Sequence, residues 1–304
     1  MKGIIPRIDR EILEQELTQE KFVRTTNYDD NEIYTVTYHD SPNVMKEIGR
    51  LRELTFRYAG GGTGDEVDID QFDTALVPYK QLIVWDPLKK EILGGYRYIL
   101  CRDLLENRGE PGLATNRLFN FSDQFIKEYL PYTIELGRSF VQPDYQSTGS
   151  SRQTIFALDN LWDGLGALTV DNPEIKYFLG KVTMYTNFKR LARDLILYFL
   201  NMYFPDKEKL AWPKEPLRIL SSTEELAAFF TGNDYQENYK ILSTRVRELG
   251  VTIPPLINSY MSLSSTMRCF GTAMNTYFGY VEETGILVTI EDIFETKKER
   301  HIGS

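Results

Sequence analysis

Strand-like runs alternate with helical patterns along this sequence, and the alternation restricts the folds that the chain can adopt. The apolar runs "QLIVWD" and "EILGGYRYIL" flank the polar sequence "PLKK", which is typical of a β-hairpin. Helical patterns occur at "NVMKEIGRLRELTFRYA", which a glycine cluster ends, at "FSDQFIKEYL" and at "IFALDNLWDGLGALTV". Further strands are predicted at "EIYTVTYH", "YTIELGRSFV" and "KYFLGKVTMY", and a largely helical stretch from Trp212 to Leu249. Together these elements predict a mixed α/β sheet.

Composition and charge exclude several classes of protein. The chain of 304 residues is 42% hydrophobic, which suits a large core and not a disordered chain. Its net charge of −9 argues against a general nucleic-acid binder, which needs a basic face. Cys101 and Cys269 lie far apart, and with only two histidines they leave no plausible zinc site. We therefore expect no metal and no permanently bound cofactor.

The chain also lacks the signals of a secreted or membrane-spanning protein. The N-terminal sequence "MKGIIPRIDREILEQEL" carries charges within a few residues and has no apolar core like that of a signal peptide. The most apolar stretch, "LILYFLNMYF", is too short to span a bilayer. These observations predict a cytoplasmic protein.

A loop of small residues follows the strand that ends at Val141. The sequence "STGSS", from Ser147 to Ser151, removes side-chain bulk just before a helical pattern, and Arg152 adds a positive charge. Unpaired N–H groups at such a helix start can bind an anion such as phosphate. The loop lacks the G-K-[ST] ending of a mononucleotide P-loop and the G-x-G-x-x-G spacing of a dinucleotide fold. The alternative is a flexible connection that caps the next helix.

Several motifs occur in the order typical of a known superfamily. Gln146, Gly149 and Ser151 have the spacing Q-x-x-G-x-S, which resembles the pyrophosphate loop of GNAT N-acyltransferases, with serine as the last small residue. The sequences "DIDQFD", "GGYRYIL" and "IELGRSFV" resemble the acidic box, G-x-R and E-x-x-R of acyl-homoserine-lactone synthases. The closer resemblance is to bacterial ornithine- and glycine-lipid N-acyltransferases, often labelled hemolysin-like. It extends from about Gly49 to Ile293.

This resemblance implies a fold and an activity. It implies a GNAT-like mixed, mostly antiparallel sheet flanked by helices, with a helical C-terminal addition. The expected organisation is an N-terminal helical segment over 1–30, an acyltransferase core over 31–210, and a helical addition with closing strands over 211–304. The implied activity transfers a fatty acyl group from acyl carrier protein to the α-amine of an amino acid, in aminolipid biosynthesis. The donor would be the carrier's phosphopantetheine thioester or acyl-CoA.

Two other functions remain open at this stage. One is a CoA-dependent N-acetyltransferase of a small amine. The other is a catalytically silent member that binds lipid or a protein partner, as the hemolysin-like label suggests. A lipid product would also allow peripheral contact with the inner face of the membrane, and no nucleic-acid partner is expected.

The resemblance also assigns roles to individual residues, which fall into catalytic, substrate-binding and donor-binding groups. The catalytic residues would be Arg97, Glu135 and Arg138. The substrate-binding residues would be Asp70, Asp73 and Ser139. The residues that bind the donor's phosphopantetheine would be Gln146, Ser147, Thr148, Gly149, Ser150, Ser151 and Arg152.

Each of these side chains also has a structural interpretation. On a strand, Glu135 and Arg138 would lie on opposite faces. Glu135 could act as a base, or form an ion pair with Arg97 or Arg138; the two can both hold. Asp70 and Asp73 could bind the acceptor's ammonium group, position Arg97, or cap a helical turn. Arg97 in an apolar strand is costly unless paired, so we expect a carboxylate partner. With no histidine in a motif nearby, direct transfer is favoured over a covalent intermediate.

Two further segments bear on the substrates. The sequence "NFKRLAR" contains Lys189, Arg190 and Arg193, which could dock the acidic carrier protein or form an ordinary solvated helix face. The sequence "SSTMRCFGTAMNTYFGYVEE" departs from the basic and glycine-rich character of the resembled family. If this segment shapes the acceptor pocket, the acceptor amine could differ from the usual one.

Overall fold

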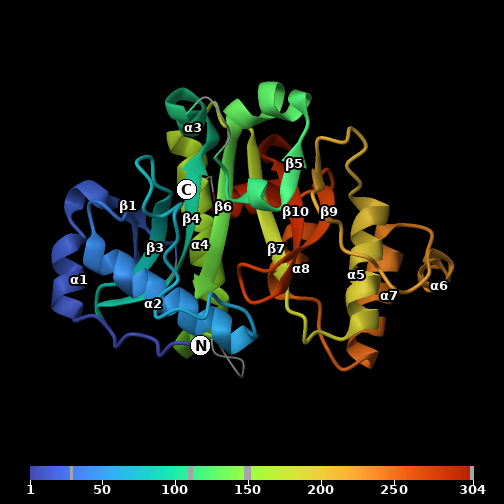
Figure 1. The fold of residues 1–304 in the computed structure, drawn as a ribbon, viewed down its shortest axis with the longest axis horizontal. Coiled ribbons are helices and arrows are strands. Elements are labelled where there is room, and N and C mark those ends of the chain that lie inside the picture. Colours follow the sequence, from blue (N-terminus) through green and yellow to red (C-terminus); the bar gives the residue numbers. More distant parts are fainter. Residues whose placement is uncertain (28–29, 109–111, 147–151, 302–304) are drawn as a thin grey trace.

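An eight-stranded sheet forms the centre of the molecule, in the order β1-β2-β3-β4-β6-β7-β10-β9 (Figure 1). The computed structural model describes residues 1–27, 30–108, 112–146 and 152–301. The strands of this sheet are β1 (Phe22–Thr25), β2 (Glu32–Val36), β3 (Lys80–Asp86), β4 (Glu91–Leu100), β6 (Thr133–Val141), β7 (Tyr177–Met184), β9 (Arg268–Asn275) and β10 (Val281–Thr289). The short strands β5 (Phe119–Phe121) and β8 (Ala211–Pro213) pair separately.

The pairing of the central sheet is antiparallel everywhere except between β6 and β7. The hairpin predicted around "PLKK" is the β3–β4 pair. The mixed, mostly antiparallel sheet expected from the sequence is therefore confirmed. Strands from both ends of the chain complete it, since β1 is one edge and β9 the other.

Helices cover both faces of this sheet. They are α1 (Arg10–Glu16), α2 (Pro42–Ala59), α3 (Cys101–Arg108), α4 (Arg152–Asp171), α5 (Arg190–Tyr203), α6 (Thr223–Ala227), α7 (Tyr235–Glu248), α8 (Pro255–Met261) and α9 (Glu295–His301). Helix α2 begins with proline in its first turn and ends at Gly60, whose φ of 100° is left-handed, as the glycine cluster predicted. In the part of the chain that the structure describes, no helix combines the length and apolarity needed to cross a bilayer.

Two helical predictions need correction. The segment "FSDQFIKEYL" is not a regular α-helix, because it contains a π-helical turn over Phe125–Tyr129 followed by a 3₁₀ turn over Leu130–Tyr132. Pro131 has no N–H to donate, so a regular helix cannot continue there. In the stretch expected to be helical from Trp212, that residue itself lies in β8, and α6 and α7 follow.

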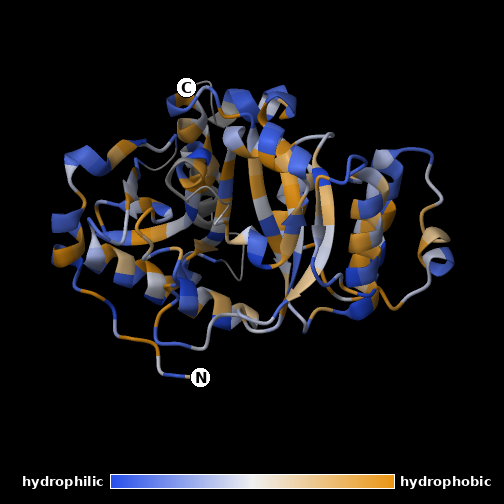
Figure 2. Cartoon of the chain, turned by 45° about the horizontal axis from the view of Figure 1, so that its top comes forward, coloured by the Kyte–Doolittle hydropathy of each residue, from blue (hydrophilic) through white to orange (hydrophobic). Residues whose placement is uncertain are grey.

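Three hydrophobic clusters fix the layers. Helices α4 and α5 pack on one face of the sheet, against side chains such as Leu82 of β3. Helices α1 and α2 pack on the other face, against Ile83. Neighbouring residues of a strand point to opposite faces, so these two clusters sandwich the sheet. A third cluster, around Phe119 and Ile99, covers another part of the face on which α2 packs, which we call the α2 face. The strands are correspondingly apolar along much of their length (Figure 2).

Polar side chains lie on the α2 face between the two clusters that cover it. Gln81 of β3 is opposite Arg97 of β4, and Arg97 is opposite Gly137 of β6. Glu135, two residues before Gly137, pairs with Leu179 of β7, and Lys181 follows two residues later. The period of two places all these residues on one face. We call Gln81, Arg97, Glu135 and Lys181 the polar band.

Candidate active site

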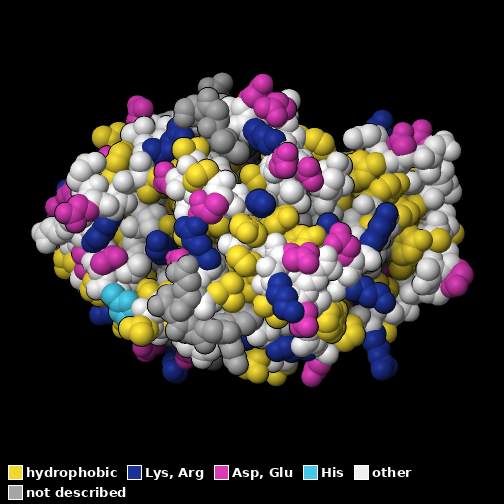
Figure 3. Space-filling model, turned by 90° about the horizontal axis from the view of Figure 1, so that it is seen from above, with side chains coloured by type: hydrophobic (Ala, Val, Ile, Leu, Met, Phe, Trp, Pro, Cys, Tyr) yellow, Lys and Arg dark blue, Asp and Glu magenta, His cyan; other side chains and the backbone are white. Residues whose placement is uncertain are grey.

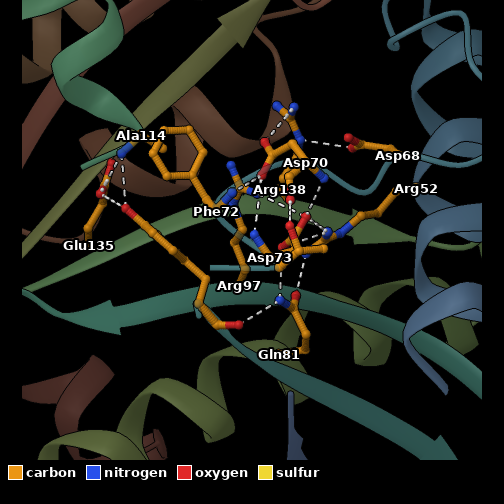
Figure 4. Close-up of polar contacts among 12 residues, drawn as sticks. Arg52, Asp68, Asp70, Phe72, Asp73, Gln81, Arg97, Ala114, Glu135 and Arg138 are labelled. Atoms are coloured by element: carbon orange, nitrogen blue, oxygen red, sulfur yellow. Dashed lines mark hydrogen bonds and ion pairs between the residues drawn. The ribbon is translucent and has the colours of Figure 1, made fainter. Parts of the chain in front are cut away.

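Arg97 lies at the centre of a buried group of charges (Figure 4). Its Nη1 atom is 2.8 Å from Oδ1 of Asp70 and 3.2 Å from Oδ2 of Asp73. Only 3% of Arg97 is exposed. The carboxylate partner predicted for this strand arginine is thus confirmed. Burial works to lower the pKa of Arg97, but the carboxylates of Asp73 and Asp70 outweigh it and raise that pKa, so the guanidinium stays charged.

Asp70 and Asp73 position Arg97 and also organise their own turn. Oδ1 of Asp70 accepts from the N–H of Phe72 at 2.9 Å, and Oδ2 of Asp73 accepts from the N–H of Asp70 at 3.0 Å. Burial works to raise the pKa of Asp70, but Arg97 and Arg138 outweigh it and hold that pKa well below its usual range. Asp70 is therefore an anion at neutral pH and no proton acceptor. Of the roles left open for these residues, positioning Arg97 therefore holds, and the turn that they organise is not part of a helix.

The buried cluster extends to Arg52 of α2, which sequence reasoning missed. Its Nη1 atom lies 3.4 Å from Oδ2 of Asp73, and its Nη2 donates to the side chain of Gln81. Arg52 is fully buried. A signal was available, because Ile48, Arg52 and Phe56 recur at a spacing of four and share one helix face. An arginine between two core positions indicates a buried charge.

The sequence predicted that Arg138 and Glu135 lie on opposite faces of β6, and for Arg138 this prediction is wrong. Its Nε atom is 2.8 Å from Oδ2 of Asp68, and its Nη2 atom is 3.7 Å from Oδ2 of Asp70, which also binds Arg97. The φ of Arg138 is 52°, and the β4–β6 register shifts at this point. Such a β-bulge breaks the alternation of faces and turns the arginine toward the cluster.

Asp68, the partner of Arg138, was not identified from the sequence. It is fully buried, and burial raises its carboxyl pKa, while the charge of Arg138 opposes that shift. Arg138 also lies over the ring of Phe278, with 4.0 Å from its guanidinium carbon to the ring centroid. The bulged arginine is therefore held between a carboxylate and an aromatic face.

Glu135 lies to one side of the arginine cluster and pairs with neither arginine among the described residues (Figure 4). Its Oε1 accepts from the N–H of Thr115 at 2.7 Å and from the Thr115 hydroxyl. Its Oε2 accepts from the N–H of Ala114 at 3.2 Å and from the hydroxyl of Tyr79. Glu135 is 1% exposed. The ion pair considered for it is therefore wrong, and the carboxylate instead anchors the Ala114–Thr115 turn.

A pocket opens beside this cluster on the α2 face. The side chains around it include Asp70, Arg97, Arg117, Arg138, Lys181 and Phe278. Phe278 and its neighbour Tyr277 belong to the turn between β9 and β10, within "SSTMRCFGTAMNTYFGYVEE". The segment that departs from the resembled family therefore does shape the pocket. Glu135, Asp73 and Ser139 do not line it.

The strands beside the pocket separate after a short contact. β6 and β7 pair only at Thr133–Glu135, opposite Tyr177–Leu179, although both strands continue further. Among the residues that the structure describes, the remainder of β6 therefore has an edge without a strand partner on this side, next to Gly137 and Lys181. An extended ligand can hydrogen-bond to such an edge.

The donor-binding loop predicted from the sequence lies mostly outside the described residues. This applies to Ser147, Thr148, Gly149, Ser150 and Ser151, and to the side chain of Arg152. Gln146 is described, and its side-chain amide donates to the carbonyl of Val141, where it braces the end of β6. Arg152 begins α4, so the sequence does pass from strand to helix across this loop.

The chain is similar in sequence to known acyltransferases. Residues 51–155 match the model of an acetyltransferase (GNAT) domain, which defines the class of protein. The whole chain is 58% identical to a glycine N(alpha)-acyltransferase of Phocaeicola vulgatus, over 94% of that protein. It is likewise 58% identical, over 99% of its length, to a glycine N(alpha)-acyltransferase of Bacteroides thetaiotaomicron, covering 90% of that protein. A solved structure of the acyl-homoserine-lactone synthase LasI matches 90% of this chain and 94% of its own, with a TM-score of 0.43 and 12% identity.

The chain belongs to the GNAT N-acyltransferase family that these glycine N(alpha)-acyltransferases represent. It is an acyltransferase.

Proposed function

We propose that this enzyme acylates the α-amine of glycine with a fatty acyl group carried on the phosphopantetheine arm of acyl carrier protein. Glycine is proposed as the acceptor because the chain is 58% identical, over essentially its full length, to two glycine N(alpha)-acyltransferases. The product, a fatty acid in amide linkage to an amino acid, is an aminolipid and partitions into membranes.

The separation of β6 and β7 supports the position of the donor. An extended pantetheine arm placed between these strands could hydrogen-bond to the unpaired edge of β6, and its thioester would reach the region of Gly137. Gly137 has no side chain, and a Cβ there would lie 3.7 Å from Nε of Arg97. The thioester would then lie beside Arg97 and the pocket. The loop from Ser147 to Arg152 would hold the phosphate at the start of α4.

The reaction itself needs a neutral amine next to the thioester carbonyl. The amine nitrogen attacks the carbonyl carbon, the C–S bond breaks, and the carrier's sulfur leaves with the bonding electron pair. The proton that the attacking nitrogen gives up ends on this sulfur, which becomes the thiol. Asp70, an anion that lines the pocket, would hold and orient the amine. Arg97 and Arg138 would place positive charge near the developing oxyanion. We assign Glu135 a positioning role, because its oxygens are occupied by four donors. Ser139 is half-buried and keeps its proposed substrate contact as a prediction.

Purified enzyme would be incubated with a long-chain acyl carrier thioester, the matching acyl-CoA and acetyl-CoA, each with a panel of free amino acids. We expect N-acylglycine with the carrier thioester as the most efficient donor, detected by mass spectrometry. Transfer from acetyl-CoA alone would support the small-amine N-acetyltransferase instead. An enzyme that acylates other amino acids but not glycine would refute the proposed acceptor.

The basic segment proposed to dock the carrier protein needs revision. Arg193 is 2.6 Å from Asp194 and 2.6 Å from Glu282, and only 12% of its side chain is exposed. It is therefore an internal partner and not a docking residue. Lys189 and Arg190 are exposed and form no ion pair among the described residues. On the face drawn in Figure 3, Lys and Arg are interspersed with Asp and Glu, so a basic docking surface would be local.

The double substitution Lys189→Glu with Arg190→Glu should raise the KM for the acyl carrier thioester by roughly tenfold and leave the KM for acyl-CoA nearly unchanged. Only the carrier has an extended acidic surface, and the effect should fade as salt screens it. The double substitution Lys127→Glu with Lys207→Glu makes the same change in charge elsewhere and serves as the control. An equal rise in the KM for both donors would point to damage to α5. An unchanged KM for the carrier thioester would place the docking surface elsewhere.

A further inference from the structure

In the described part of the chain, most of the cations around the pocket have a carboxylate within ion-pair distance, and Arg117 does not. Three arginines meet three carboxylates in the buried cluster: Arg52, Arg97 and Arg138 with Asp68, Asp70 and Asp73. Lys181, at the other side of the pocket, has its Nζ 3.9 Å from Oε2 of Glu283. Arg117 also lines the pocket, and among the described residues no carboxylate lies within ion-pair distance of it. The pocket therefore offers one guanidinium without an anion.

The surroundings of Arg117 hold it in place without neutralising it. Its guanidinium carbon lies 4.5 Å from the ring centroid of Phe72 and 5.6 Å from that of Tyr277. Arg117 ends the 3₁₀ turn Thr115–Arg117, whose first residue is bound by the buried carboxylate of Glu135. Aromatic faces orient a guanidinium plane and leave its N–H groups free for a planar anion such as a carboxylate.

We propose that Arg117 binds the α-carboxylate of the amino-acid acceptor, while Asp70 on the same pocket holds its amine. This inference rests on the proposed function, because it specifies how that acceptor is recognised. An α-amino acid carries its carboxylate and its amine on one carbon, so it matches a small pocket that contains both an unpaired cation and an anion. Phe72 links the two ends, since its N–H donates to Asp70 and its ring packs against Arg117.

The assignment has a consequence for specificity. A site that pairs a charged group with the substrate favours acceptors that carry the matching group. Arg117 is exposed to solvent, so an analogue without a carboxylate loses the charge-assisted hydrogen bond to the guanidinium, which then bonds to water. Amines without a carboxylate should therefore be poor acceptors, whatever their size.

The test compares glycine with glycinamide, which keeps the amine but not the negative charge. We expect Arg117→Gln to lower kcat/KM for glycine by about 10- to 100-fold, since a hydrogen bond to a charged group is being removed. The same variant should change kcat/KM for glycinamide by less than about twofold. Comparing each acceptor with itself across variants cancels the difference in amine basicity. Arg117→Lys, which keeps the charge, should recover part of the loss, and the KM for the acyl donor should stay unchanged.

Arg245→Gln is the matched control, because Arg245 is half-exposed on α7 and pairs with Glu248. If Arg117→Gln lowered kcat/KM equally for glycine and glycinamide, the proposal would be overturned and Arg117 would have a purely structural role. A rise in the KM for the donor would overturn it in favour of a contact with the carrier's phosphopantetheine. A wild-type enzyme that acylates amines but shows no preference for a carboxylate would refute the inference and leave the acyltransferase activity standing.

Discussion

Arg97→Ala should both abolish acyl transfer and lower the free energy of unfolding by roughly 3–5 kcal/mol, the usual result of removing one partner of a buried ion pair. The substitution leaves Asp70 and Asp73 without their closest cation, and Asp73 is fully buried while Asp70 is largely buried. Chemical denaturation measures the stability, and transfer to glycine measures the activity. Arg102→Ala is the control, because Arg102 forms a partly exposed pair with Glu174 and should cost less than about 1 kcal/mol.

The same variant should respond differently to acid. Arg97 helps to depress the pKa of Asp70 and Asp73 in the folded protein. A carboxyl whose folded pKa is depressed contributes stability above its unfolded pKa, near 3.8, and loses it as the pH falls through the folded value. Wild-type stability should therefore drop below about pH 4, and the drop should be smaller in Arg97→Ala. A wild-type unfolding curve for the variant would mean that Arg97 is solvated and its carboxylates are paired otherwise.

Glu135→Gln should reduce transfer strongly and also destabilise the protein, by about 1–3 kcal/mol. Four donors converge on this carboxylate, from Thr115, Ala114 and Tyr79. A glutamine replaces one acceptor oxygen by an NH₂ group, which would then face donors and not acceptors. The turn that carries Arg117 should shift as a result. Unfolding by denaturant and the KM for glycine are the measurements.

These measurements separate the two roles considered for Glu135. A positioning residue gives lower stability together with a higher KM for the acceptor. A direct base would give a lower kcat at unchanged stability, with loss of the acidic limb of the pH–rate profile. Tyr79→Phe is the matched control, because it removes one of the four donors and leaves the carboxylate with the other three. Its effect on both quantities should be smaller.

Local periodicity allowed the mixed sheet and the hairpin to be predicted, whereas the order of the site motifs was recognised by resemblance to known N-acyltransferases. The partner of Arg97 was predictable for an energetic reason, since a charge in an apolar strand must be paired. The orientation of Arg138 was not, because the bulge at that point depends on how β6 meets β4. Arg193 likewise resembles a surface residue in sequence and is internal only because Glu282 arrives from β10.

The contact between β6 and β7 has a consequence for how the molecule is held together. Only three residue pairs join the two halves of the sheet, β1 to β6 on one side and β7, β10 and β9 on the other. Elsewhere the halves are joined by side-chain packing, both in the core that α4 and α5 share and in the cluster around Phe119 and Ile99. The gap between β6 and β7 can therefore become wider or narrower through substitutions of the side chains along it, without loss of strand pairing. With the donor in the position proposed above, such substitutions would change which acyl chain fits, while each half of the sheet keeps its own strand pairing.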